Sequence, residues 1–423
     1  MTAADWSAVL GVVRDARWMT PARGRAYCKI LLVITPLAAI AWIALARGGI
    51  DLYGKPIGAD FISFWTASKI ALSGTPSHVY DVDLHWAAQR GLFAGAHLNY
   101  TAFFYPPVYL LICLPLALLP YTWSLVCWLG VTGCAYWRVI AELAGRRAMT
   151  LPILTFPAVY WNAMNGQNGF LTTALFGGAL LAVETRPVIA GICFGCLAYK
   201  PHLAIVVPFA LLARRRWMTL GVAAVTAIAL CAASLAVLGP ATWQAFLADT
   251  PLARAALEQN LVGNEKMQSV FAAVRLLGGS MDLAYGLHMV VALTIVSLLT
   301  YLCRTVPMRD GGGAALATAT LLASPFLLGY DLVLLAIPLV WILREANRTQ
   351  FLPWEKTVLL AAFLLPLLST PVAARLHLPL APPVILALFA VVFRRGIRAA
   401  HSSVALRGLG WPASATVTAP VNH

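Results

Sequence analysis

Charged side chains are scarce in this sequence. Lys, Arg, Asp and Glu make up 11% of the 423 residues, whereas 61% of the residues are hydrophobic. An ordinary soluble domain contains about 25% charged and 45–50% apolar residues. So few charges cannot cover a water-exposed surface at this length, which excludes an ordinary soluble protein. We therefore expect an all-α polytopic membrane protein whose main partners are membrane lipids.

Several sequence signatures of soluble catalysis are also missing. The chain has no Walker A loop, no G-x-S-x-G, no H-E-x-x-H and no dinucleotide fingerprint. Nucleotide-driven cytoplasmic chemistry is therefore not indicated, and a transferred group is expected to arrive on a lipid. Asp81-Val82-Asp83 has the spacing of a metal-binding pair, but it follows Tyr80 at what looks like the start of a surface helix. We expect no metal and no other cofactor.

Cysteines and basic residues give no sign of other functions. Cys193 and Cys196 form a C-x-x-C within an apolar helix that has no second ligand pair nearby, so buried packing is the preferred interpretation. No basic run is interleaved with exposed polar sequence, so nucleic acid is not an expected partner. The oligomeric state is not indicated by any of these patterns.

Apolar segments occur along most of the chain, although several are shorter than the roughly 20 residues of a full membrane span. They lie near 29–47, 106–119, 121–141, 149–164, 168–184, 187–200, 201–213, 217–239, 283–303, 312–328, 331–344, 356–374 and 378–393.

Basic clusters indicate the orientation of these spans, because Lys and Arg accumulate on the cytoplasmic side. The clusters are the N-terminal arm, Arg146 with Arg147, Arg214 to Arg216, Arg304 with Arg309, Arg344 with Arg348, and Arg394 and Arg395 with Arg398. Placing all of them inside requires an odd number of crossings between 48 and 145. Segment 121–141 is longer and free of proline, so we assign it as the span and 106–119 as an interfacial or half-inserted segment.

This assignment gives about twelve spans with both termini in the cytoplasm. The formal net charge of +14 then falls on the cytoplasmic side, where it is an orientation signal. The expected parts are a cytoplasmic arm over 1–28, a transmembrane domain over 29–398 and a disordered cytoplasmic tail over 399–423. Two long extracytoplasmic loops, about 48–105 and 240–282, are rich in aromatic residues, and we expect them to be ordered and functional. Amphipathic stretches in them, such as 81–94, suit the membrane surface.

Asp60 is the first candidate for chemistry. It stands alone in the apolar and aromatic sequence Gly58-Ala59-Asp60-Phe61, shortly after the first span. Desolvation there would raise the pKa of the carboxyl, which suits a general base acting on a hydroxyl. The alternative is an N-cap for a helix over 61–73, a position that Asp favours. The residue type alone supports both interpretations equally.

Two further segments offer groups that can bind a sugar. Tyr105, before Pro106 and Pro107, can shape the mouth of a groove, although interfacial tyrosines are also common. The turn between two spans contains Asn165, Gln167 and Asn168. A simple turn needs glycines but not these amides, so the amides are candidates for binding sugar hydroxyls.

Charged residues at the outer ends of spans complete the candidate set. Lys200 and His202 flank a proline between two short spans and form a plausible phosphate cradle, unless Lys200 snorkels to the interface. Tyr330 and Asp331 lie at another span end, where Asp331 can equally be a helix cap.

The order of motifs then resembles a known family. The motifs are G-A-D-F, L-S-G-T-P, V-Y-D, F-F-Y-P-P, P-L-A-L-L-P, N-G-Q-N, R-P-V-I-A-G, Y-K-P-H, R-R-R-W and S-P-F. Together they resemble glycosyltransferase family 87, which includes polyprenol-phosphate-mannose-dependent α-1,2-mannosyltransferases. The resemblance extends over about 55–340. It implies a GT-C type fold with interfacial helices in the first extracytoplasmic loop, an active site on the extracytoplasmic face and a polyprenyl-phosphate sugar donor.

Carried over by position, the resemblance suggests roles for single residues. Asp60 looks like the catalytic base, Lys200 falls in the K-P element and Gln167 in the G-Q element. Where many members have a histidine after the S-P segment, this chain has Tyr330 and Asp331. Taking the residues and the resemblance together, we expect catalysis by Asp60, donor phosphate binding by Lys200 and His202, and sugar or acceptor binding by Tyr105, Asn165, Gln167, Asn168, Tyr330 and Asp331.

The implied reaction is the inverting transfer of a hexose, mannose, to a hydroxyl of a lipid-linked or cell-envelope glycan at the inner (plasma) membrane. No metal is needed because the leaving phosphate is a stable anion. The rival interpretation is a transporter or lipid flippase, which would place polar groups near the middle of the bilayer in broken helices. Here the polar groups gather at outer span ends.

Overall fold

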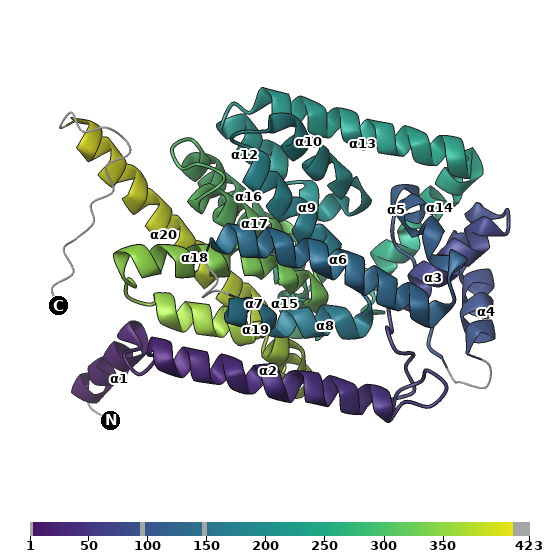
Figure 1. The fold of residues 1–423 in the computed structure, drawn as a ribbon, viewed down its shortest axis with the longest axis horizontal. Helices are drawn as coiled ribbons and strands as arrows, with labels where there is room; N and C mark the ends of the chain where they lie inside the picture. Colours follow the sequence, from purple (N-terminus) through teal and green to yellow (C-terminus); the bar gives the residue numbers. More distant parts are fainter. Residues whose placement is uncertain (1–2, 94–97, 146–149, 409–423) are drawn as a thin grey trace.

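The computed structural model describes residues 3–93, 98–145 and 150–408, and these ranges fold into helices without a β-strand (Figure 1). The expected all-α class is therefore confirmed for them. Five helices are long and apolar enough to cross a bilayer: α2 (Pro21–Ala44), α6 (Tyr121–Ala144), α13 (Trp217–Leu238), α16 (Met281–Cys303) and α19 (Glu355–Leu376). The total of about twelve crossings and the GT-C topology stay predictions.

The longest apolar helices face outward. Thr20 caps α2 by accepting a hydrogen bond from the Arg23 backbone N–H, and Pro21 occupies the first turn. Side chains around all faces of α2 remain outside the core, and α13 is nearly as exposed. Apolar surfaces of this extent require lipid around them.

Shorter helices pack between and against the long ones. They are α9 (Gly169–Ala182), α10 (Pro187–Cys196), α17 (Gly311–Ala323) and α18 (Ala336–Thr349). Small residues permit close packing of their backbones. A Cβ atom added at Gly195 of α10 would lie 2.6 Å from the Ala223 carbonyl oxygen of α13.

Short α-helices and 3-10 helices connect these helices. They are α7 (Thr150–Leu154), α8 (Pro157–Asn165), η4 (Leu197–Tyr199), α11 (Pro201–Ala204), α12 (Val207–Ala213) and η5 (Gly329–Leu335).

The first long loop is folded into its own group of helices. It contains α3 (Phe61–Leu72), η1 (Pro76–Tyr80) and α4 (Val82–Leu92), followed by α5 (Pro107–Cys113) and η2 (Leu114–Leu118). The Ser68 hydroxyl of α3 donates to the Leu114 carbonyl at 2.7 Å. The segment expected to be interfacial is thus a short broken element packed on α3, whereas α6 is long enough to span.

The second long loop is also ordered. It forms α14 (Pro240–Glu258) and α15 (Val270–Leu276), and the Phe246 ring of α14 lies 5.6 Å from the Tyr80 ring. The Gln268 backbone N–H donates to the Leu327 carbonyl at 2.7 Å. The two loops therefore pack on each other and on the segment that leads to Asp331.

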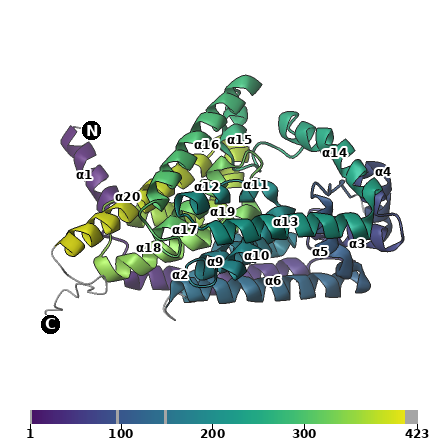
Figure 2. The same ribbon diagram turned by 90° about the horizontal axis from the view of Figure 1, so that it is seen from above.

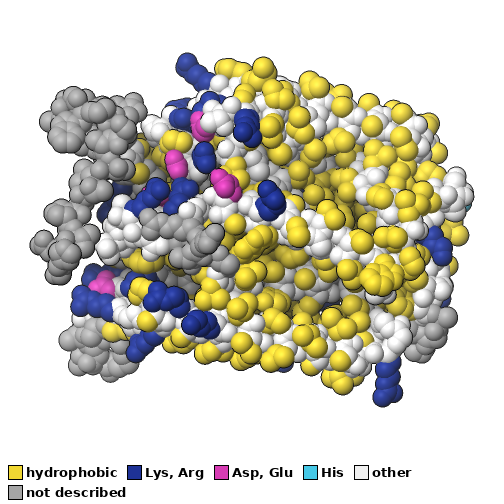
Figure 3. Space-filling view, in the orientation of Figure 1, with side chains coloured by type: hydrophobic (Ala, Val, Ile, Leu, Met, Phe, Trp, Pro, Cys, Tyr) yellow, Lys and Arg dark blue, Asp and Glu magenta, His cyan; other side chains and the backbone are white. Residues whose placement is uncertain are grey.

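The ends of the molecule differ in charge. In Figure 1, α2 and α6 run between one end that carries α1 (Ala3–Asp15) and α20 (Ala381–Gly408) and an opposite end that carries α3, α4, α5 and α14. The turned view in Figure 2 keeps this separation. Lys and Arg side chains gather at the α1 and α20 end, whereas hydrophobic side chains cover most of the remaining face (Figure 3). The positive-inside rule predicts that the basic end is cytoplasmic.

Both terminal segments of the described chain contain helix. The arm is helical over α1, α2 already begins at Pro21, and the Trp354 backbone N–H donates to the Arg14 carbonyl at 2.6 Å. Helix α20 continues to Gly408, so the expected disorder is wrong for 399–408 because the helix runs on beyond the apolar segment. Residues 409–423 of the expected tail and the Arg146-Arg147 cluster lie outside the described residues.

Candidate active site

A tight turn between α8 and α9 forms the base of the site. Gly166 has φ 66°, a left-handed conformation in which glycine is favoured, and a Cβ atom there would lie 2.6 Å from the Phe61 Cβ of α3. The buried Asn162 side chain donates to the Gln167 carbonyl at 3.2 Å and accepts from the Gly169 N–H at 2.9 Å. These contacts fix the turn against the start of α3.

Asp60 lies at the N-cap position of α3, but its side chain makes no capping hydrogen bond. Its backbone N–H donates instead to the Asn165 carbonyl at 3.0 Å, and its Oδ2 accepts from Gln167 Nε2 at 3.0 Å. No described residue hydrogen-bonds Oδ1. The geometry therefore does not support the capping interpretation, and it leaves one carboxylate oxygen available to a substrate.

The environment of Asp60 changes its ionisation. Burial raises the pKa of the carboxyl above its usual range, while the Gln167 hydrogen bond and the charges of Lys55, Lys266 and Lys200 oppose this shift. The direction agrees with the expectation from the apolar sequence around Asp60. A carboxylate with a raised pKa is a stronger base for a hydroxyl proton.

Tyr105 connects the first loop to the turn. Its hydroxyl donates to Gln167 Oε1 at 3.4 Å, and its carbonyl accepts from the Tyr80 hydroxyl at 2.9 Å. The ring centroid lies 4.4 Å from that of Tyr109. Burial raises the pKa of Tyr105 well above its usual range, so the phenol stays protonated and donates.

Lys200 and Asp331 form a buried ion pair. Lys200 Nζ lies 2.5 Å from Asp331 Oδ1, and both side chains are at most 3% exposed. Nζ also donates to Asn168 Oδ1 at 3.1 Å and lies 4.9 Å from the Tyr330 ring centroid. Lys200 therefore does not snorkel to the interface. Asp331 Oδ2 accepts from the Leu328 N–H at 3.1 Å, so this residue is both a helix cap and an ion-pair partner.

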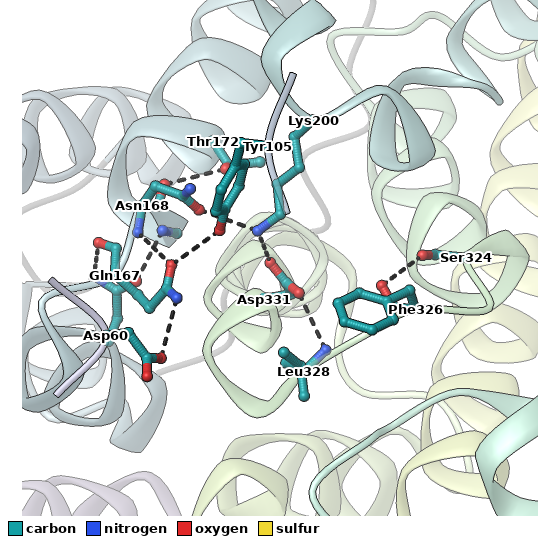
Figure 4. Close-up of polar contacts among 12 residues, drawn as sticks. Asp60, Tyr105, Gln167, Asn168, Thr172, Lys200, Ser324, Phe326, Leu328 and Asp331 are labelled. Atoms are coloured by element: carbon teal, nitrogen blue, oxygen red, sulfur yellow. Dashed lines mark hydrogen bonds and ion pairs between the residues drawn. The ribbon is translucent and has the colours of Figure 1, made fainter. Parts of the chain in front are cut away.

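One continuous set of hydrogen bonds joins these residues. Figure 4 shows it running from Asp60 through Gln167 to Tyr105 and Asn168, and on through Lys200 to Asp331. It connects the two carboxylates by way of the turn. Of the residues proposed from the sequence, it contains Asp60, Tyr105, Gln167, Asn168, Lys200 and Asp331.

Three predicted residues lie beside this set, and the first of them, Tyr330, contacts it only through its ring, which faces Lys200 Nζ. The Asn165 side chain donates to the Trp161 carbonyl of its own helix at 2.7 Å and is not part of the set. His202 Nε2 is buried without a hydrogen-bond partner among the described residues, and its ring centroid lies 6.5 Å from that of Phe326. The histidine therefore has hydrogen-bonding capacity to offer a ligand.

Some residues of the site were not predicted. Asn162 holds the turn by both ends of its amide, and the Trp128 indole of α6 donates to the Gly166 carbonyl at 3.2 Å. The position of Asn162 one turn before Gly166 was a usable signal, whereas nothing in the sequence around Trp128 indicates its partner. Within 3–93, 98–145 and 150–408, no three His, Cys, Asp or Glu residues lie close enough to hold a metal ion.

Comparison with known proteins identifies the family. The family model of glycosyltransferase family 87 matches residues 103–325, which is more than half of the chain. The matched range contains Tyr105, the turn, Lys200 and His202, whereas Asp60 precedes it and Asp331 follows it. No curated protein and no solved structure has significant similarity to the chain.

Proposed function

The chain belongs to glycosyltransferase family 87, so it is a membrane glycosyltransferase, and we propose that its donor is a polyprenyl-phosphate sugar. The sugar is a hexose, mannose, and the acceptor is a hydroxyl of a lipid-linked or cell-envelope glycan. Transfer proceeds with inversion at the extracytoplasmic face of the inner (plasma) membrane. The site lies in a GT-C type fold of about twelve spans, whose termini are both cytoplasmic.

The observation that carries this proposal is the state of Asp60. One of its oxygens is held by Gln167, the other has no partner among the described residues, and burial raises its pKa. Asp60 Oδ1 takes the proton of the acceptor hydroxyl as the hydroxyl oxygen attacks the anomeric carbon. The bond from that carbon to the phosphate oxygen breaks, and its electron pair leaves with the phosphate.

The leaving phosphate is bound by Lys200 and His202. An ammonium group has three N–H donors, and Asn168 and Asp331 accept from Lys200 Nζ, so one donor is left for the phosphate. His202 Nε2 supplies a second contact because it is buried and unpaired among the described residues. The phosphate is already stable as an anion, so the step needs no general acid and no metal.

The sugar and acceptor meet the remaining groups of the site. Asn168 Nδ2 is buried without a hydrogen-bond partner among the described residues, so it can donate to a sugar hydroxyl. Tyr330 supplies an aromatic ring beside Lys200 Nζ, and Tyr105 supplies one beside Gln167. Asp331 has both oxygens engaged, so it acts mainly through the orientation of Lys200.

The test is transfer by the purified, liposome-reconstituted chain from radiolabelled polyprenyl-phosphate mannose, glucose or arabinose to membrane glycolipid extract. General-base assistance contributes about 10²–10⁴-fold, so Asp60→Asn should lower transfer by that factor while the protein stays folded. Full transfer by Asp60→Asn would remove Asp60 as the base. Movement of a labelled lipid across the bilayer without any sugar transfer would favour a transporter or flippase.

A further inference from the structure

The side-chain amide of Gln167 can face only one way. Its Oε1 accepts from the Asn168 backbone N–H at 3.1 Å and from the Tyr105 hydroxyl at 3.4 Å. A backbone N–H can only donate, so the amide oxygen must be the atom that faces it. The NH₂ group is therefore directed to Asp60, and Nε2 lies 3.0 Å from Asp60 Oδ2.

The backbone of the same turn also holds Asp60. The Asp60 N–H donates to the Asn165 carbonyl at 3.0 Å, and the turn is itself fixed by the Asn162 side chain. Gln167 is 4% exposed, so water does not compete freely for its amide. Asp60 thus has one oxygen in a fixed hydrogen bond and one oxygen that faces no described donor.

We propose that Gln167 is a positioning residue that holds Asp60 Oδ2 and so selects Oδ1 as the oxygen that receives the acceptor proton. This inference rests on the proposed function, because it assigns a role in the same reaction. It differs from a sugar contact, since the amide oxygen and one amide hydrogen of Gln167 are used within the protein.

The hydrogen bond has a second effect on Asp60. A donor to the ionised form favours ionisation, so Gln167 counteracts part of the rise in pKa that burial causes. Other groups also act on this carboxyl from the elements around it. They are the lysines Lys55, Lys200 and Lys266 and the tyrosines Tyr105, Tyr121 and Tyr330. Gln167→Leu leaves these groups in the chain but also removes the acceptor of the Tyr105 hydroxyl and of the Asn168 N–H, whereas Gln167→Glu keeps that acceptor.

The first experiment does not depend on activity. Dicyclohexylcarbodiimide reacts with protonated carboxyl groups in apolar surroundings, and peptide mass spectrometry across a pH series gives the midpoint for labelling of Asp60. We expect the midpoint to rise by about one pH unit in Gln167→Leu, because a hydrogen bond to a charged group is lost. Gln167→Glu keeps the acceptors for Tyr105 and Asn168 and faces Asp60 with a second carboxylate, so its midpoint should rise further.

Gln89 offers a matched control. It is a fully buried glutamine that donates to the Thr101 carbonyl at 2.7 Å and accepts from the Thr101 N–H at 3.1 Å, without contact with Asp60. Gln89→Leu should leave the Asp60 midpoint unchanged. An unchanged midpoint in both Gln167 variants would overturn the inference, as would an equal shift in Gln89→Leu.

Steady-state transfer separates this inference from the proposed function. In Gln167→Leu, kcat should fall by about 10–100-fold with an unchanged donor KM, and the acid limb of the pH profile should move upward. Wild-type transfer accompanied by a normal profile in Gln167→Leu would overturn the positioning role alone. Absence of transfer in the wild type with every donor would overturn the proposed function, and the labelling midpoint would still decide whether Gln167 controls Asp60.

Discussion

The Lys200 and Asp331 pair should be strongly coupled, because both charges are removed from water. Nζ and Oδ1 lie 2.5 Å apart, and the side chains are 3% and 2% exposed. Removal of one partner from such a pair typically costs about 3–5 kcal/mol, since the other charge stays buried without compensation. Lys200→Met leaves Asp331 with the Leu328 N–H, and Asp331→Ala leaves Lys200 with Asn168 Oδ1. We expect each single variant to lose stability in this range.

The double variant Lys200→Met/Asp331→Ala contains no buried charge at this position. Its loss should therefore be smaller than the sum of the single losses, by about 2–3 kcal/mol of coupling. The measurement is reversible unfolding in mixed micelles with increasing denaturing detergent. Additive losses would refute the coupling.

The Glu355 and Arg395 pair provides the matched control, since it is also buried, with Arg395 Nη2 2.5 Å from Glu355 Oε2, and lies at the start of α19. Glu355→Gln should lower stability but leave donor KM unchanged, whereas Lys200→Met should lower stability and raise donor KM. Equal effects on donor KM would remove Lys200 from the donor site.

Three other predictions concern Asp60 and the turn. Because the folded-state pKa of Asp60 is raised, the stability that this carboxyl contributes is complete below the unfolded pKa of about 3.9 and is lost as pH rises through the folded pKa. At neutral pH, Asp60→Asn should therefore unfold at an equal or higher temperature than the wild type. A clear fall in Tm would contradict this. Transfer should show the opposite dependence and increase as pH rises through the same pKa, because the base must be ionised; a rate that is flat through the acid range would exclude this carboxyl. Asn162→Ala should lower the free energy of unfolding by about 1–3 kcal/mol, because it leaves buried groups of the turn unpaired. Asn165→Ala removes an exposed hydrogen bond to Trp161 and should lower it by less than about 1 kcal/mol. Equal losses of stability in unfolding experiments would show that Asn162 does not hold the turn.

Local sequence features predicted which residues belong to the site better than they predicted which of these residues contact one another. The raised pKa of Asp60 follows from an isolated carboxylate among apolar residues, and the structure gives the same direction. The choice between base and N-cap depended on where the side chain points, which the sequence does not specify. Asp331 was expected to be either a cap or a functional residue, and it is both a cap and an ion-pair partner because its two oxygens face different donors.

The prediction of disorder for 399–408 failed because the sequence pattern changes at the end of an apolar segment. The apolar segment expected to end at 393 is followed by several arginine, alanine and leucine residues, which favour helix, so α20 continues to Gly408. Asn165 has the same amide as Asn168, yet it lies at the end of α8 and bonds back to Trp161. Which partner such an amide finds depends on the direction in which its side chain points at the end of the helix.

The sequence by itself determined that this protein lies in a lipid bilayer, that it is helical and in which order its apolar segments follow one another. Hydrophobicity and charge act locally along the chain, so a scarcity of charge and the spacing of basic clusters can be read without the fold. Only the tertiary structure decided which polar groups meet. Gln167 binds Asp60 across 107 positions, and Lys200 binds Asp331 across 131. Those pairs exist because packing of α3, the turn and η5 brings buried polar groups together, and each group must then find its partner inside the protein.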